Sequence, residues 1–320
     1  MIEEQRSTST PQPAVNVVAL IIFRRPETTA RVLQTLQGIE ISRLYVIADG
    51  PRQNKIGEAE LVEATRKLVD EIDWHCEVVK LYSNTNLGLR ERVLSGLDEV
   101  FSHEESAIIL EDDCLPNPDF FAFSTELLER YTANETVALV SGNNFASKPT
   151  MADSYYFSSH ANIWGWATWA RTWREFRTTR MEEFLSDGAQ TEIARAISSR
   201  FQRASFLSLL RNAKDLDSWA IQFAAHCYLK GQLSAVPKVN LVSNIGFGAE
   251  STHTKFESYA DEVQAQNLDF PLNHPKTVGP NAAEMRRESR IKALRWFTYP
   301  LAHPIDFLGR VVRYLRLRVR

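Results

Sequence analysis

Three consecutive carboxylates follow an apolar segment directly in this sequence. Residues 107–110 read as a short buried strand, and Glu111, Asp112 and Asp113 come immediately after it. Three like charges at the end of a buried strand call for an opposing charge, and hard divalent cations take oxygen ligands. The segment therefore predicts a Mn²⁺ or Mg²⁺ site that would assist a departing diphosphate. The alternative is a solvated, inert loop start.

Polar residues also follow two earlier segments that read as strands. Arg25 comes after the first, where it could pair with phosphate through its planar guanidinium or be solvated. Asp49 ends the second and could bind a base or ribose hydroxyl, or belong to an Asp-Gly turn. Arg90 follows Gly88 where a helix should begin, a place suited to an anion. The alternative for Arg90 is a surface arginine on a capped helix.

A tryptophan-rich segment forms the second unusual feature. Trp166, Trp169 and Trp173 are spaced i, i+3, i+7, which predicts one face of a helix packed in the core. Gly165 indicates a close approach of the backbone. Trp164 precedes the predicted helix and could stack on the face of a sugar.

Two acids and a histidine further along could also take part in chemistry. Asp215 and Asp217 open a predicted helix, where an acid is either an N-cap or a general base toward a hydroxyl. Residues 246–254 are rich in glycine, serine and threonine and read as a lid. His253 within them could contact phosphate or a metal, although a lone loop histidine more often does neither.

Strands and helices alternate over the first 110 residues, which predicts βαβ units and a parallel sheet in an α/β fold. Ligands bind at the carboxyl ends of such strands. Asn117 and Pro118 predict the start of a helix. The expected strands are 15–23, 44–48, 78–82, 107–110, 137–140 and 233–236, and the expected helices are 27–36, 58–70, 89–101, 120–131, 192–210 and 218–230.

Composition narrows the class of protein. The 320 residues carry 37 Lys and Arg against 40 Asp and Glu, a net charge of −3 that argues against nucleic-acid binding. The 3 cysteines are widely spaced and fit a reducing, cytoplasmic compartment. No signal peptide or membrane-spanning run is apparent in the sequence.

We expect one catalytic domain with short extensions. Residues 1–14 read as a flexible N-terminus, 15–145 as a nucleotide and metal half, and 146–290 as an acceptor half. Residues 291–320 read as a basic amphipathic tail, since 286–320 holds ten Arg and Lys against two acids. Such a tail predicts peripheral binding to the inner face of a cell membrane, or a helix packed on its own domain.

Together these residues resemble nucleotide-sugar glycosyltransferases of the GT-A fold, a Rossmann-like sheet flanked by helices. The likeness is to the N-acetylglucosaminyltransferase I type and related bacterial glycosyltransferases, over residues 15–255. The segment 108–113 followed by 118–121 is similar to that family's Glu-Asp-Asp variant of the DxD motif and the helix after it.

The resemblance implies roles for the donor-side residues. Asp113 would bind the metal, while Glu111 and Asp112 would contact the ribose or sugar of the donor. Arg25 would contact the diphosphate and Asp49 the base.

The resemblance also implies an acceptor side. Gly165-Trp166 resembles the pair that walls the donor-sugar pocket, and Asp217-Ser218-Trp219 resembles an Asp-Asp-Trp site whose acid is the catalytic base. Because Ser218 replaces the second acid, the base is either Asp217 or Asp215.

The implied reaction is metal-dependent, inverting transfer of GlcNAc or a similar sugar. The donor would be a nucleoside-diphosphate sugar, with UDP favoured. The acceptor would be a hydroxyl of a glycan or lipid-linked glycan, in bacterial surface polysaccharide synthesis.

Two other functions remain open. A nucleotidyltransferase acting on sugar phosphates would need a glycine-rich, basic loop after the first strand, and residues 24–27 do not provide one. A non-catalytic sugar- or lipid-binding protein on a decayed transferase scaffold would not need to keep the acids described above.

Overall fold

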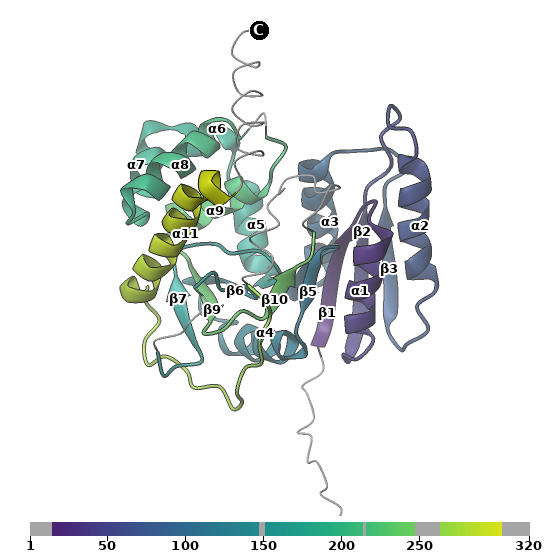
Figure 1. The fold of residues 1–320 in the computed structure, drawn as a ribbon, viewed down its shortest axis with the longest axis horizontal. Coiled ribbons are helices and arrows are strands. Elements are labelled where there is room, and N and C mark those ends of the chain that lie inside the picture. The colour runs from purple at the N-terminus through teal and green to yellow at the C-terminus, as the bar shows by residue number, and fades with distance from the viewer. Residues whose placement is uncertain (1–14, 147–150, 214–215, 247–262, 303–320) are drawn as a thin grey trace, which may run out of the picture.

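The computed structural model describes residues 15–146, 151–213, 216–246 and 263–302, and a mostly parallel sheet lies at its centre (Figure 1). Strands β3, β2, β1 and β4 run parallel to one another, and β6 is parallel to β9. This confirms the α/β class. The strand order is β3 (Glu77–Tyr82), β2 (Ile41–Ala48), β1 (Val15–Ile22), β4 (Ser106–Glu111), β8 (Trp166–Trp169), β6 (Val137–Ser141), β9 (Leu233–Pro237) and β7 (Tyr155–Ser158).

Both faces of the sheet are covered by helices. Successive residues of β1 alternate between two hydrophobic clusters, since Leu20 packs in one and Ala19 and Ile21 in the other. A strand buried on both faces reads as a continuous apolar run, which is why β1 was recognisable. One face carries α1 (Pro26–Leu36), α2 (Glu58–Asp70) and α4 (Pro118–Arg130); the other carries α3 (Leu89–His103), α5 (Ala170–Thr178) and α9 (Ala220–Leu229).

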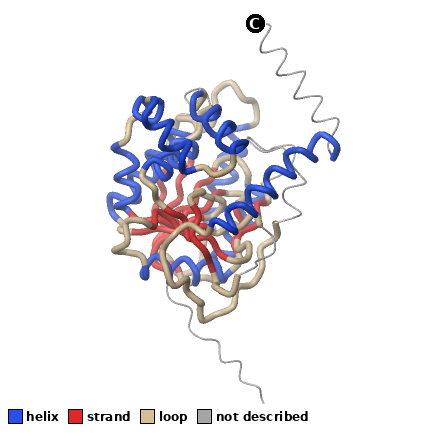
Figure 2. The backbone as a smooth tube through the Cα atoms, turned by 90° about the vertical axis from the view of Figure 1, so that its left-hand side faces the viewer, coloured by secondary structure: helices blue, strands red, loops and turns tan. Residues whose placement is uncertain are grey.

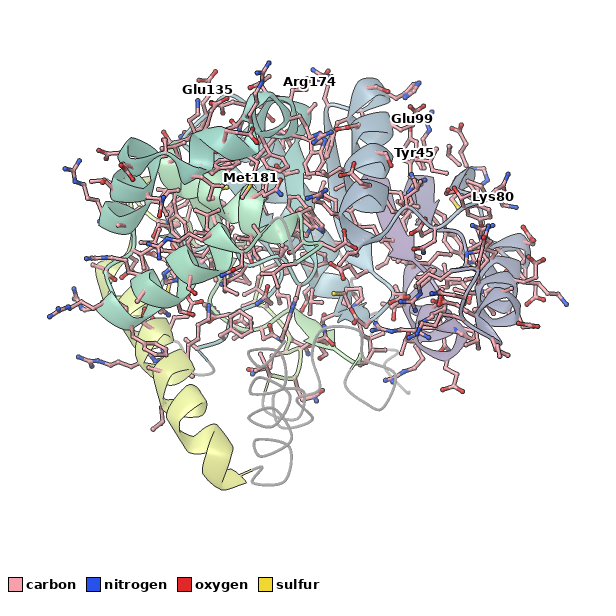
Figure 3. The ribbon with its side chains drawn as sticks, turned by 90° about the horizontal axis from the view of Figure 1, so that it is seen from above. Tyr45, Lys80, Glu99, Glu135, Arg174 and Met181 are labelled. Atoms are coloured by element: carbon pink, nitrogen blue, oxygen red, sulfur yellow. The ribbon has the colours of Figure 1, made fainter. Side chains whose placement is uncertain are left out.

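The helix start predicted at Asn117 and Pro118 is confirmed, and α1 begins one residue earlier than expected. Pro26 begins α1, and Asn117 caps α4 by accepting a hydrogen bond from the backbone N–H of Asp119 at 2.9 Å. On the α3 side of the sheet, Tyr45, labelled in Figure 3, donates its hydroxyl to Glu104 at 2.9 Å. Because Glu104 follows the last residue of α3, this contact ties the end of that helix to β2.

The tryptophan-rich segment differs from expectation. Trp166 and Trp169 lie in strand β8, which is inserted antiparallel between β4 and β6, so the prediction of one helix face was wrong. Helix α5 begins only at Ala170, and Trp173 lies on it. All three tryptophans are buried, as a core role requires. The spacing i, i+3, i+7 arose because a four-residue strand leads directly into a helix.

The second half adds a helical subcluster beside the sheet. The expected helix over 192–210 is two helices, because Ser199 ends the intervening turn and caps the second one. The subcluster consists of α6 (Met181–Leu185), α7 (Asp187–Ala196) and α8 (Arg200–Arg211), packed on α9. A separate two-stranded ladder joins β5 (Cys114–Pro116) to β10 (Val242–Asn244).

Helix α11 (Ala282–Ala302) crosses the boundary expected at 290, and its later turns project from the body of the molecule (Figure 2). Its Glu288 is fully buried and accepts hydrogen bonds from His160 and Asn162, each at 3.2 Å. Lys292 completes the cluster with an ion pair to Glu288 at 2.5 Å. The first half of this helix therefore belongs to the domain. Within the described ranges, no helix is long and apolar enough to cross a bilayer.

Candidate active site at the carboxyl edge of the sheet

The three acids and Arg25 meet at the carboxyl ends of β1 and β4. These strands are parallel neighbours, with Ile21 opposite Glu111, so the residues that follow them emerge side by side. The guanidinium Nη1 of Arg25 lies 2.7 Å from Asp113 Oδ2 and 3.2 Å from Asp112 Oδ1. Asp112 also accepts a backbone hydrogen bond from Phe23 at 3.2 Å. Parallel pairing thus joins residues almost ninety positions apart in the sequence.

The three acids at this edge can carry more negative charge than the single positive charge of Arg25 balances. Burial raises the pKa of Glu111 to about 8, and the charges of Asp113 and Asp112 add to this shift. Burial likewise raises the pKa of Asp112 to about 7, with a further contribution from Asp113, while Arg25 acts in the opposite direction. A second cation at this edge would relieve that repulsion.

The residues present fit a divalent ion that is shared with a substrate. The described part of the chain contains no group of three or more His, Cys, Asp or Glu side chains able to hold a metal by themselves. Mg²⁺-type ions, however, are commonly bound by one or two carboxylates together with substrate phosphates and water. Asp113, the last acid before β5, could supply such a carboxylate. Its side chain is 14% exposed, so it is partly accessible.

Gly246 closes one side of the Asp113 carboxylate. The backbone N–H of Ile245 donates to the carbonyl of Asp113 at 2.8 Å, and Asn244 holds the Gly246 N–H at 2.9 Å. A Cβ atom at Gly246 would lie 2.1 Å from Asp113 Oδ2, so only glycine fits without movement. From the sequence, Gly246 is predicted only as part of a lid over residues 246–254.

Gly165 brings a second loop close to the same edge. Its φ is +62°, and an added Cβ would lie 2.7 Å from Val242, a residue of β10. Its carbonyl accepts a hydrogen bond from Gly142 at 2.7 Å. The neighbouring Trp164 is partly exposed and packs edge-to-face on Phe145 at 5.1 Å between ring centroids. Trp164 therefore has a surface on which a sugar could stack.

Trp166 lies deeper than Trp164. It is 1% exposed and stacks on Trp219 at 5.6 Å between ring centroids, with Phe223 also in contact. Trp166 is therefore a core residue on the α9 side of the sheet, and Trp164 is the more exposed of the two tryptophans.

The carboxylate of Asp49 is occupied by the loop before α3. It accepts hydrogen bonds from the backbone N–H groups of Gly50, Leu87 and Gly88, at 2.9 to 3.1 Å, and from the side chain of Asn86 at 3.0 Å. Burial raises its pKa, and these backbone bonds oppose the shift. The side chain therefore holds the β3–α3 loop, an interaction that leaves little capacity for a nucleoside base.

The carboxylate of Asp217 lies at the start of α3, although Asp217 comes from the second half of the chain. Its exposed carboxylate accepts hydrogen bonds from the backbone N–H groups of Leu89 at 2.9 Å and Arg90 at 3.2 Å. Its φ of +38° is uncommon for a residue with a side chain. The guanidinium of Arg90 itself pairs with Glu91 at 3.0 Å.

Asp49 and Asp217 together use four consecutive N–H groups, those of residues 87–90. The helix start that the sequence suggested for an anion therefore holds a carboxylate of the chain itself. No local pattern signals this pairing, because Asp217 lies more than a hundred residues from its partners. Asp215 and His253, with the rest of the expected lid, lie outside the described residues.

No family model and no curated protein matches this chain. Among solved structures, it is similar to an inositol-1-phosphate CTP transferase from T. maritima (12% identity, 88% of this chain and 98% of that one, TM-score 0.35). It is also similar to a mannosyltransferase from Pyrobaculum calidifontis in complex with GDP-Man and Mn²⁺ (14%, 66% and 69%, 0.33). A third is UDP-glucose pyrophosphorylase complexed with UDP-glucose (8%, 69% and 90%, 0.34). Likenesses at these identities and TM-scores do not identify the reaction of this chain.

Proposed function

We propose that this protein is a GT-A-type glycosyltransferase that uses a nucleoside-diphosphate sugar. The observation that carries the proposal is the contact of Arg25 with Asp112 and Asp113 at the carboxyl edge of parallel strands. Ligands of α/β sheets bind at this edge. A guanidinium beside carboxylates that suit a divalent ion matches the two partners that a diphosphate needs.

The donor would be held by residues from the first half of the domain and by Trp164. Asp113 would share a Mn²⁺ or Mg²⁺ ion with the diphosphate, and that ion would stabilise the negative charge of the departing nucleotide. Arg25 would contact the same diphosphate. Glu111 and Asp112 would orient the ribose or sugar, and Trp164 would stack on the sugar. We favour UDP as the nucleotide and GlcNAc or a similar hexosamine as the sugar.

Asp217 is the proposed base on the acceptor side. An exposed carboxylate can accept the proton of an acceptor hydroxyl as that oxygen attacks the anomeric carbon from the face opposite the diphosphate. The sugar would then be transferred with inversion. Asp215, which precedes it by two residues, is the alternative base.

The acceptor would be a glycan or a lipid-linked glycan at the cytoplasmic face of a membrane. Arg286 and Arg290 are exposed one turn apart on α11, and Leu294, one turn further, is 64% exposed. This stripe of basic and apolar side chains suits the interface of an anionic bilayer. Its attachment through Glu288 would keep the catalytic domain close to that surface.

A nucleotide-binding screen tests the proposal. UDP, GDP and their sugars should be titrated by thermal shift with and without Mn²⁺, in the wild type, in Asp113→Ala and in Asp73→Ala. Asp73 is an exposed acid before β3 and serves as the matched control. We expect Mn²⁺-dependent stabilisation by one nucleotide, lost only in Asp113→Ala. Equal stabilisation of all three proteins would contradict the proposed metal and donor site.

A further inference from the structure

The side chain of Arg25 occupies the carboxylate that a metal would need. Its Nη1 contacts Asp113 Oδ2 at 2.7 Å, a short distance for a charge-assisted hydrogen bond, and reaches Asp112 as well. The Arg25 side chain is 18% exposed, and those of Asp112 and Asp113 are 10% and 14% exposed. The ion pair is therefore shielded from much of the screening that weakens a surface pair.

The backbone of Gly246 lies against another side of Asp113 Oδ2. Gly246 lies against Asp113 Oδ2 so closely that a Cβ atom there would stand 2.1 Å away. The other oxygen, Oδ1, lies 3.7 Å from the thiol of Cys114. An ion that approaches Oδ2 therefore meets Arg25 on one side and the backbone of Gly246 on another.

We propose that Arg25 is a displaceable counter-ion, which holds Asp113 in the free protein and is released when a metal ion enters together with a diphosphate. This inference rests on the proposed function for the identity of the diphosphate ligand. In the exchange, Asp113 replaces one cationic partner with another, and Arg25 replaces a carboxylate with phosphate oxygens. Neither charge is left without a partner.

Such an exchange couples the two ligands. A metal that arrives alone would have to expel Arg25 from Asp112 and Asp113 without offering it another anion. A nucleotide that arrives alone would draw Arg25 away and leave the three carboxylates facing each other. Each ligand therefore binds weakly without the other, and the coupling is reciprocal by thermodynamic linkage.

Mn²⁺ titration without nucleotide tests the inference directly. Mn²⁺ binding should be measured by calorimetry and by water-proton relaxation in the wild type, Arg25→Gln, Arg25→Lys and Arg31→Gln. Arg31 is an exposed arginine on the same helix α1 and gives the matched change in charge. Arg25→Gln loses a charged hydrogen bond to Asp113 and should therefore bind Mn²⁺ about tenfold more tightly than the wild type. The affinity of Arg25→Lys should lie between those of the wild type and Arg25→Gln, and that of Arg31→Gln should equal the wild-type value.

The same titration with saturating UDP measures the coupling. In the wild type, UDP should tighten Mn²⁺ binding by tenfold or more, and in Arg25→Gln this enhancement should largely disappear. The inference is overturned if both Arg25 variants bind Mn²⁺ no more tightly than the wild type in the absence of nucleotide. If no nucleotide binds but Arg25→Gln still gains Mn²⁺ affinity, the counter-ion role stands and the proposed donor is wrong.

Discussion

Replacement of Asp217 by asparagine separates two roles for this carboxylate, base and helix cap. Asparagine tolerates a φ of +38° and keeps one oxygen that can accept from the N–H groups of Leu89 or Arg90. It cannot accept the proton of an acceptor hydroxyl. Asp217→Asn therefore preserves much of the cap and removes the base.

The two roles predict effects of different size on turnover and on stability. Loss of a positioned general base lowers turnover by about 10²–10⁴-fold. Weakening the cap, including the interaction of the charge with the start of α3, costs about 0.5–1 kcal/mol of stability. For a domain of this size, that cost lowers the melting temperature by about 1–4 °C.

The assay is release of nucleoside diphosphate from the donor identified by the binding screen, in the presence of Mn²⁺. We expect Asp217→Asn to bind the donor as the wild type does and to lose turnover by the larger factor. Asp49→Asn is the control, because Asp49 holds the adjacent N–H groups of the same loop. It should lower stability, with a smaller effect on turnover. Wild-type turnover in Asp217→Asn would refute the assignment of this residue as base and would transfer the role to Asp215.

Two further predictions concern the acidic edge, alongside those for Asp113 and Arg25. Gly246→Ala should weaken Mn²⁺-dependent nucleotide binding about tenfold or more, because its Cβ atom would displace Asp113 Oδ2. Gly188→Ala is the control, because a Cβ atom at Gly188 meets nothing within 4 Å. Equal affinities of the two variants in titration calorimetry would refute this prediction. Burial raises the pKa of Glu111 from 4.5 to about 8, so the folded state disfavours the ionised form of this side chain. The free energy of unfolding that the protonated Glu111 contributes below pH 4.5 is therefore lost as the pH rises toward 8. Glu111→Gln should therefore gain about 1–3 kcal/mol relative to the wild type between pH 5 and 8 in metal-free denaturant unfolding, and a constant difference would contradict the cause given for the shift.

The sheet and its carboxyl edge could be predicted because their signals are local. A continuous apolar run marks β1 and β4, and parallel pairing then brings the residues after them together, as with Arg25 and Asp113. The roles of Asp49 and Asp217 could not be predicted in this way. Asp217 binds backbone groups more than a hundred residues away, and backbone groups leave no trace in side-chain patterns. Trp166 was misplaced because its spacing fits a helix and also a strand that leads into one.

The occupied start of α3 narrows where a diphosphate can bind. The sequence offers two positive features for an anion, Arg25 after β1 and the N-terminal amides of α3. The structure fills the second with the carboxylate of Asp217, and Asp49 takes the two amides before it. A diphosphate would displace a carboxylate at either place. At Arg25 the proposed metal ion would take over the released Asp113, whereas no cation is proposed for a released Asp217. We therefore expect a diphosphate to bind at Arg25 together with the metal, while the start of α3 holds Asp217 from the second half of the chain.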